Sequence, residues 1–225
     1  MNRLLHLVVV AVSLCAVGCS GEDQGSGDDG AVGCDPASPP SRTASCVGSF
    51  TPGAGAGQGQ DSFPENIFGE PHGAGDRKGN VDDVLSLGKG GEIVLGFGGG
   101  AIVDGPGADL IVFENAFYAF GDPAKPFKEL AEVSVSLDGV TWTPFPCARD
   151  LAPYDGCAGK TPVFANPVTG VSAFDPAVSG GDTFDLAAVG LAEARFVRIR
   201  DQGDIDAAPN AGFDLDAAAI VNGSP

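Results

Sequence analysis

The residues from Gly91 to Phe117 contain two predicted β-strands joined by a glycine-rich turn. In the first, Ile93, Leu95 and Phe97 alternate with the residues between them, which is the period-two pattern of a sheet with one packed face. The second, Leu110 to Phe113, is continuously apolar, which predicts a strand covered on both sides in the middle of a sandwich. Acidic or amide side chains stand at the ends of these strands: Asp104, Asp109, Glu114 and Asn115.

The rest of the chain favours an all-β fold. Glycine and proline (35 and 17 of 225 residues) interrupt nearly every window in which a helix could form, while 43% hydrophobic residues suffice for a core. Further strands are predicted over residues 81–87, 130–137, 194–200 and 212–221. The pair Asp138-Gly139 predicts a two-residue turn, from which residues 140–143 return as a partner strand.

The N-terminus has the composition of an export signal. Arg3 precedes an apolar run from Leu4 to Val17 that is too short to cross a bilayer comfortably. The run ends in Ala-Val-Gly-Cys, which resembles the lipobox of bacterial lipoproteins and implies a signal peptide over 1–18 and lipidation of Cys19. We expect a lipoprotein of the cell envelope, at the outer membrane or cell surface, that contacts the membrane through this lipid. An ordinary secretory leader is the alternative.

Residues 19–49 are predicted to form an acidic linker rich in Gly, Ser and Pro, and residues 50–225 the β-sandwich domain. The formal net charge of the chain is −18. This charge argues against nucleic acid and anionic membrane surfaces as partners, and it favours cations.

Four cysteines remain after the leader and Cys19: Cys34, Cys46, Cys147 and Cys157. They allow three disulfide connectivities, of which local pairing (34 with 46, 147 with 157) closes two short loops and is preferred. A zinc site is the competing interpretation, but the wide spacing and the oxidising compartment argue against it.

Two motifs carry a family resemblance. The sequence SLDGVTW at residues 136–142, followed by ARFVRI at 194–199, resembles the discoidin (factor five/eight type C) domains, which are jelly-roll β-sandwiches of the galactose-binding-like fold. Residues 86–221 are also similar to a group of predicted bacterial cell-surface proteins with phrases such as DGPG-x-D, VFEN and GFDLDA. The resemblance implies a jelly roll in which Trp142 packs inward.

Several chemistries are disfavoured by what the chain lacks. His72 is the one histidine left after the leader, which disfavours a catalytic triad and excludes a histidine-rich metal centre. Residues 96–100 are glycine-rich but open no predicted helix, so they are interpreted as a turn and not as a nucleotide-binding loop.

Carboxylates are the remaining candidates for a site. Asp214 and Asp216 lie two apart on a predicted strand, so both are expected on one face, where their repulsion requires a compensating cation. Calcium takes six to eight oxygen ligands from irregular loops of this kind. The family resemblance implies a structural calcium near the joint of early and final strands. The predicted ligands are Glu114 and Asp216, then Asp104 and Asp109, with Asp214.

Two alternatives to this calcium site stay open: the acids are solvated or cap turns, or two carboxylates form a glycosidase-type hydrolase site. Phe117, Tyr118 and Phe120 lie in a Pro/Gly-rich loop and could form a platform for stacking sugars. Arg198 and Arg200 are expected to face outward and pair with acids. We therefore expect a non-catalytic, calcium-stabilised binding or adhesion module, with a carbohydrate-binding accessory domain as the first alternative and a hydrolase as the second.

Overall fold

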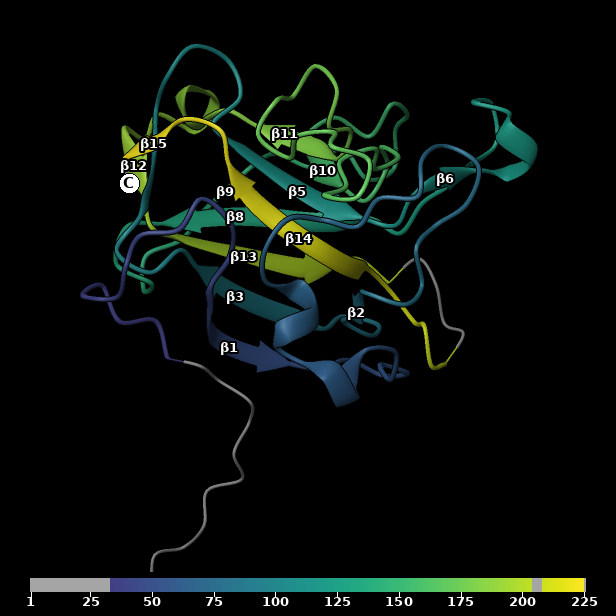
Figure 1. The fold of residues 1–225 in the computed structure, drawn as a ribbon, viewed down its shortest axis with the longest axis horizontal. Coiled ribbons are helices and arrows are strands. Elements are labelled where there is room, and N and C mark those ends of the chain that lie inside the picture. The colour runs from purple at the N-terminus through teal and green to yellow at the C-terminus, as the bar shows by residue number, and fades with distance from the viewer. Residues whose placement is uncertain (1–32, 204–207, 225) are drawn as a thin grey trace, which may run out of the picture.

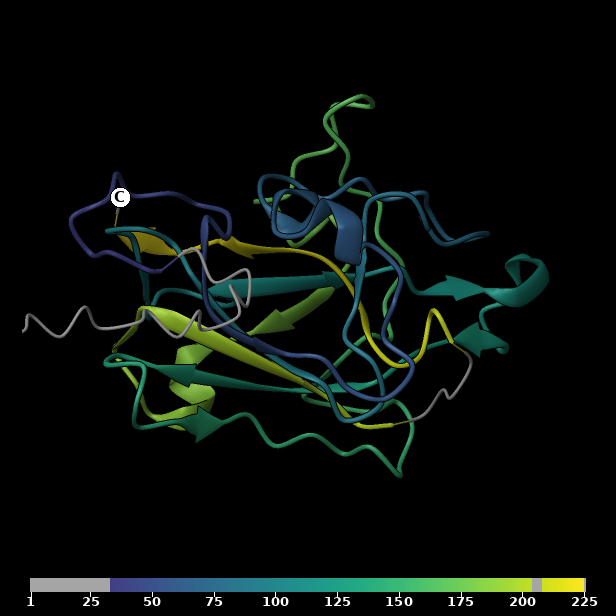
Figure 2. The same cartoon turned by 90° about the horizontal axis from the view of Figure 1, so that it is seen from below.

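The computed structural model describes residues 33–203 and 208–224 and shows an all-β sandwich (Figure 1). One sheet has the strand order β1-β3-β13-β8-β10, with β9 beside β8, and the other has the order β11-β5-β14-β2. All pairings between described strands are antiparallel. The turned view in Figure 2 shows the two layers from the side.

The six-stranded sheet contains β1 (Cys46–Thr51), β3 (Glu92–Gly96), β8 (Ala131–Ser136), β9 (Thr143–Pro144), β10 (Cys157–Ala158) and β13 (Phe196–Asp201). The four-stranded sheet contains β2 (Leu85–Ser86), β5 (Leu110–Glu114), β11 (Asp182–Phe184) and β14 (Asp214–Ile220). Smaller sheets join β4 (Ala101–Val103) to β12 (Glu193–Ala194) and β15 (Gly223–Ser224), and β6 (Phe117–Tyr118) to β7 (Pro126–Phe127). Short 3-10 helices are η1 (Gln60–Ser62), η2 (Glu65–Ile67), η3 (Ala119–Gly121) and η4 (Leu186–Val189).

The main core lies between the two large sheets and follows the predicted alternation. Ile93 and Leu95 of β3 are fully buried in it, as are Val133 of β8 and Val197 and Ile199 of β13. Because strand residues two apart share a face, these alternating positions put one apolar side of each strand against the opposite sheet.

The strand β5 is buried on both faces, which confirms the prediction from its continuous apolar run. Leu110 and Val112 belong to the main core. Ile111 and Phe113 point to the other side, where they form a second cluster with residues such as Val163 of the long loop between β10 and β11. A single strand therefore connects the interior of the sandwich to a small outer core.

The predicted hairpin around Asp138 forms with a longer loop than expected. The return strand β9 begins at Thr143 and not at residue 140, and Leu137 is 54% exposed. Asp138 Oδ1 accepts the amide hydrogens of Val140 and Thr141, at 2.8 and 2.7 Å. In a two-residue hairpin these backbone N–H groups would form hydrogen bonds between the two strands. Here they donate to a side chain instead, so the return strand begins later. The strand predicted over residues 81–87 is likewise reduced to Leu85–Ser86.

These hydrogen bonds lower the pKa of Asp138 from about 3.8 to about 2, with the amide of Thr141 as the largest cause. Since the folded pKa is below the unfolded one, the carboxylate stabilises the protein at pH above 3.8, and this contribution is lost as the pH falls through 2. We expect an NMR titration of Asp138 with a midpoint near 2. Ser136→Ala removes a 3.0 Å hydrogen bond to Asp138 and should raise the midpoint, whereas a wild-type midpoint at 3.8 would contradict the geometry.

The folded part of the chain begins earlier than predicted. β1 starts at Cys46, inside the segment assigned to the linker, and Arg42 donates to the carbonyl oxygen of Ile220 at 3.0 Å. Ala44 is buried in the main core. The predicted signal peptide and Cys19 lie outside the described residues.

Both predicted disulfides are present. Cys34 pairs with Cys46, and Cys147 pairs with Cys157. Disulfides of this kind persist in oxidising compartments, so they indicate an extracytoplasmic protein.

Trp142 does not pack inward as the resemblance implied. Its half-buried ring lies under the guanidinium of Arg198, with 4.8 Å from Cζ to the ring centroid. Arg198 projects from β13 opposite to the buried Val197 and Ile199, so Trp142 covers the outer face of the sheet. Arg198 also lies 3.9 Å from Glu92, which confirms its predicted pairing with an acid.

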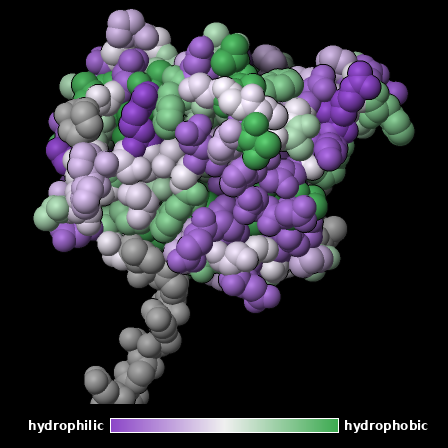
Figure 3. Space-filling view, viewed as in Figure 1, coloured by the Kyte–Doolittle hydropathy of each residue, from purple (hydrophilic) through white to green (hydrophobic). Residues whose placement is uncertain are grey.

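The β6–β7 hairpin projects from one end of the sandwich (Figures 1 and 2). It carries η3 at its tip, and the space-filling view shows the same projection as a largely hydrophilic lobe at the upper right (Figure 3).

Candidate functional site

Three acidic residues gather at the end of the four-stranded sheet where β5 begins. Asp104, Asp109 and Asp185 each place a carboxylate oxygen within 4.8 Å of the others. Among residues 33–203 and 208–224, this is the one group of three acidic, histidine or cysteine residues with such spacing. The structure thus brings together two of the predicted metal ligands and adds Asp185, which the sequence analysis missed.

Hydrogen bonds within the protein hold two carboxylates of this triad in place without an ion. The fully buried Asp109 accepts from Gly105 N and Asn222 Nδ2 with one oxygen, and from Leu186 N with the other, at 2.9, 3.0 and 2.8 Å. Asp185 accepts from Ala187 N and so caps η4. The triad is a candidate for a divalent cation because of its three carboxylates, but these contacts give it a structural role as well.

Glu114 stands at the other end of β5, about 15 Å away at the rise of an extended strand. Its side chain is buried, and neither carboxylate oxygen has a hydrogen-bond partner among the described residues. Burial raises the pKa of Glu114 well above its usual value, and the charges of Glu129 and Asp214 raise it further, while the nearby backbone N–H of Asn115 lowers it without reaching normal hydrogen-bond geometry. An ionised carboxylate in this position is costly unless a cation compensates it.

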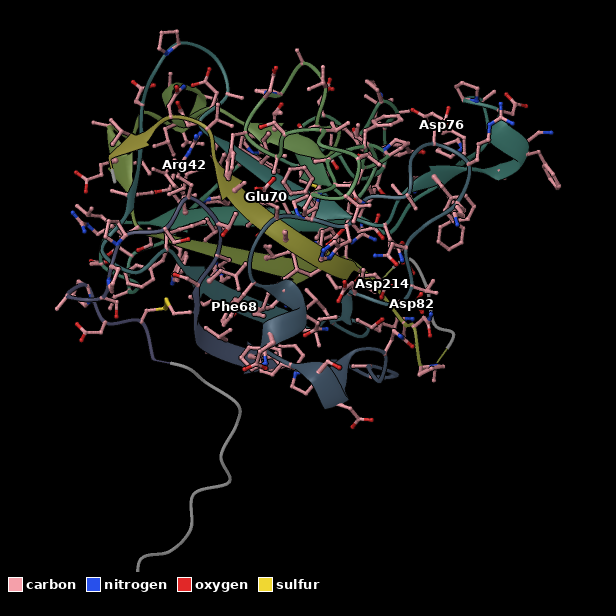
Figure 4. The ribbon with its side chains drawn as sticks, in the orientation of Figure 1. Arg42, Phe68, Glu70, Asp76, Asp82 and Asp214 are labelled. Atoms are coloured by element: carbon pink, nitrogen blue, oxygen red, sulfur yellow. A yellow bond between two sulfur atoms is a disulfide. The ribbon has the colours of Figure 1, made fainter. Side chains whose placement is uncertain are left out.

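Asp214 and Asp216 of β14 flank the same region, with Asp214 labelled where the strand begins (Figure 4). A register irregularity between Leu215 and Ala217 breaks the period-two pattern on which their predicted common face depended. Asp214 accepts hydrogen bonds from Ser86 Oγ and Asn115 Nδ2, and Asp216 accepts from the backbone N–H of His72. Burial raises the pKa of Asp214 to about 6 and that of Asp216 to about 7.

The loop over residues 71–80 closes over this end of the sheet. Asn115 Nδ2 donates to the carbonyl oxygen of Asn80, whose own side chain donates to the carbonyl oxygen of His72. Gly79 lies so close to Asn115 that a Cβ atom at position 79 would be 2.6 Å from the backbone carbonyl oxygen of Asn115. The hydrogen bonds of this loop hold main-chain and amide groups against the acidic end of β5 and β14.

A narrow pocket, too tightly closed to hold a water molecule in this structure, forms beneath the loop. Glu114, Asn115, Asp216 and Asn80 line it together with Lys78, Val163 and residues 73–75 of the loop. We call this set the β5–β14 site. The carboxylate and amide oxygens of these side chains are ligand types that calcium prefers, and Lys78 would compete with the ion as a counter-charge. The His72 ring contacts the carboxylate of Asp83, with 2.7 Å between Nδ1 and Oδ2.

The predicted ligands therefore fall into two groups at opposite ends of β5. Asp104 and Asp109 belong to the triad, while Glu114, Asp214 and Asp216 belong to the other end of the sheet. Asp185 and Glu129 were missed. Glu129 lies two residues before β8 begins, so the alternation within that strand gives no signal for its burial.

The aromatic residues proposed as a sugar platform do not share one surface. Phe117 stacks on Phe127 with 4.9 Å between ring centroids. Tyr118, the next residue, points to the other side of the hairpin and lines a different pocket. Phe120 is 96% exposed at the tip, with a positive φ of 62°.

In the part of the chain that the structure describes, no helix has the length and apolar character needed to cross a membrane. The sequence matches no protein-family model, and comparison with curated proteins and with solved structures finds no significant match.

Proposed function

We propose that the protein is an exported, lipid-anchored module of the cell surface that acts by binding or adhesion, without catalysis, and whose β-sandwich is stabilised by calcium at the β5–β14 site. The observation that carries the calcium assignment is the buried carboxylate of Glu114, neither of whose oxygens has a partner among the described residues. The disulfides and the lipobox-like leader support the extracytoplasmic placement.

Protonation alone is a poor explanation for Glu114. A neutral carboxyl group avoids the charge, but it still presents an O–H donor and a carbonyl oxygen that need partners when buried. A calcium ion would satisfy both oxygens and offset the repulsion from Asp214 and Glu129. In this proposal Glu114 and Asp216 supply carboxylate oxygens, and Asn115, Asn80 and the loop main chain supply neutral ones.

The same proposal includes a more specific assignment of the fold within the all-β sandwiches. Two antiparallel layers and the motifs at residues 136–142 and 194–199 support a galactose-binding-like jelly roll of the discoidin type. The resemblance implies calcium near the joint of an early and a final strand. The β5–β14 site lies at such a joint, since β5 pairs with β14.

Calcium should raise the melting temperature of the EDTA-treated protein by about 5–10 °C when its concentration is about a hundred times its dissociation constant. Glu114→Gln should abolish most of this increase because it removes the charge at constant shape. In EDTA the variant should be no less stable than the wild type, because the glutamine is uncharged.

Asp104→Asn is the matched control, since Asp104 is exposed and belongs to the triad. It should leave the calcium response intact. Loss of the calcium response in Asp104→Asn, but not in Glu114→Gln, would show that calcium binds at the triad and not at the β5–β14 site. An unchanged wild-type melting temperature, together with no heat of calcium binding by calorimetry, would end the calcium proposal.

The carbohydrate-binding alternative is favoured by one observation, the pocket that Tyr118 lines beside the projecting hairpin. The hydrolase alternative would use Glu114 as a general acid because of its raised pKa. Its oxygens are buried, so a substrate could reach them only after the loop over residues 71–80 moves.

A further inference from the structure

A second pocket lies between the β6–β7 hairpin and the loop closed by the Cys147–Cys157 disulfide. Tyr118 and Pro126 of the hairpin line one side, Pro153 and Tyr154 of the disulfide loop line another, and Lys128 and Lys160 complete the wall. Its volume is about 490 Å³, within the range of about 300–1,000 Å³ typical of small-molecule sites. We call it the tyrosine pocket.

The walls of the tyrosine pocket are held in place before any ligand arrives. Tyr154 has a positive φ of 62°. The loop that contains it is closed by the Cys147–Cys157 disulfide. Such a backbone conformation is unfavourable for a residue with a side chain and is found often at binding sites. Tyr118 is fixed by its backbone N–H, which donates to the carbonyl oxygen of Asp76 at 2.7 Å, and Asp76 is labelled beside the hairpin (Figure 4).

The residue types that line this pocket differ from those of the whole protein. The chain has 30 acidic and 12 basic residues, yet none of the described residues that line the pocket is acidic and two are lysines. Lys128 places its ammonium group 4.4 Å from the centre of the Tyr154 ring. Lys160 Nζ lies 2.9 Å from the buried Asp182 and donates to the carbonyl oxygen of Cys157, so its charge is largely compensated within the protein. Lys128 is therefore the group that favours a carboxylate in this pocket.

We propose that the tyrosine pocket binds an oligosaccharide that contains uronic acid. Each uronic acid ring has an apolar face that can pack on a tyrosine ring. It also has hydroxyl groups that can form hydrogen bonds with the phenol oxygens. Its carboxylate can accept a hydrogen bond from the ammonium group of Lys128. This inference rests on the proposed binding function and names its ligand class, but it does not require calcium.

Isothermal titration calorimetry of the protein with a galacturonic acid oligomer, in EDTA, tests the proposal. Binding should be measurable, and the fully methyl-esterified oligomer of equal length should bind at least tenfold more weakly because it lacks the charges. Lys128→Gln should weaken binding about tenfold, as expected for loss of a hydrogen bond to a charged group. Tyr118→Ala should have a similar effect.

Two matched controls lie on the same hairpin outside the pocket: Lys125→Gln and Phe120→Ala should each change affinity less than twofold. An equal loss in Lys125→Gln and Lys128→Gln would show unspecific attraction and overturn the proposal. Equal binding of the esterified oligomer, or tighter binding of an oligoglutamate peptide, would also overturn it. Because EDTA is present throughout, absence of calcium binding and absence of saccharide binding are separate results.

Discussion

Replacing Phe113 by alanine should lower the free energy of unfolding by about 3–5 kcal/mol, the usual loss for a buried phenylalanine. Phe113 is fully buried on the outer face of β5, where it packs in the cluster with Ile111 and Val163. Chemical denaturation with urea measures the change. The size of the loss reports whether the loop between β10 and β11 seals a true second core.

Phe120→Ala removes the same side chain from a 96% exposed position and serves as the control. It should change stability by less than about 0.5 kcal/mol. A loss below 1 kcal/mol in Phe113→Ala would mean that the outer cluster is loosely packed and that β5 has only one structurally important face.

Replacing Asp109 by alanine should destabilise the protein by about 2–4 kcal/mol, because it leaves several N–H donors without an acceptor. Asp109 joins the start of β5 to Leu186 of η4 and to Asn222 before β15. The donor of Leu186 is buried, so water cannot replace its partner cheaply. Thermal and urea unfolding both measure this loss.

Asp104→Ala changes an exposed member of the same triad and should alter stability by no more than about 0.5 kcal/mol. Asp109→Asn keeps one acceptor oxygen and should lie between the wild type and Asp109→Ala. If Asp104→Ala and Asp109→Ala were equally destabilising in calcium and equally harmless in EDTA, the triad would be a cation site and its hydrogen bonds secondary.

Much of the strand pattern could be predicted from sequence because it depends on local periodicity. Alternation at Ile93 and Leu95 gave one buried face, and the unbroken apolar run of β5 gave two. The disulfides were predictable for a similar reason, since sequence separations of 10 and 12 residues keep each pair close in any compact fold. Strand ends were less certain because side chains such as Asp138 compete for backbone amides.

The grouping of the acidic residues could not be predicted from spacing. Asp109 and Asp185 are 76 positions apart and meet only because β11 pairs with β5 and leads into η4. Likewise, Asn80 and Asn115 meet through a loop that folds back over the sheet. The irregularity between Leu215 and Ala217 is also a tertiary feature, and it sends Asp214 and Asp216 to different partners.

The sequence by itself determined that this protein forms an all-β domain with strands of known inner faces and two local disulfides, because side-chain periodicity and short loops act over a few residues. Only the tertiary structure decided which polar groups share a pocket: Glu114 with Asp216 and Asn80, Tyr118 with Tyr154. Contacts between distant segments depend on how sheets pair and pack, and the alternation of a single strand carries no information about the strand that will lie beside it.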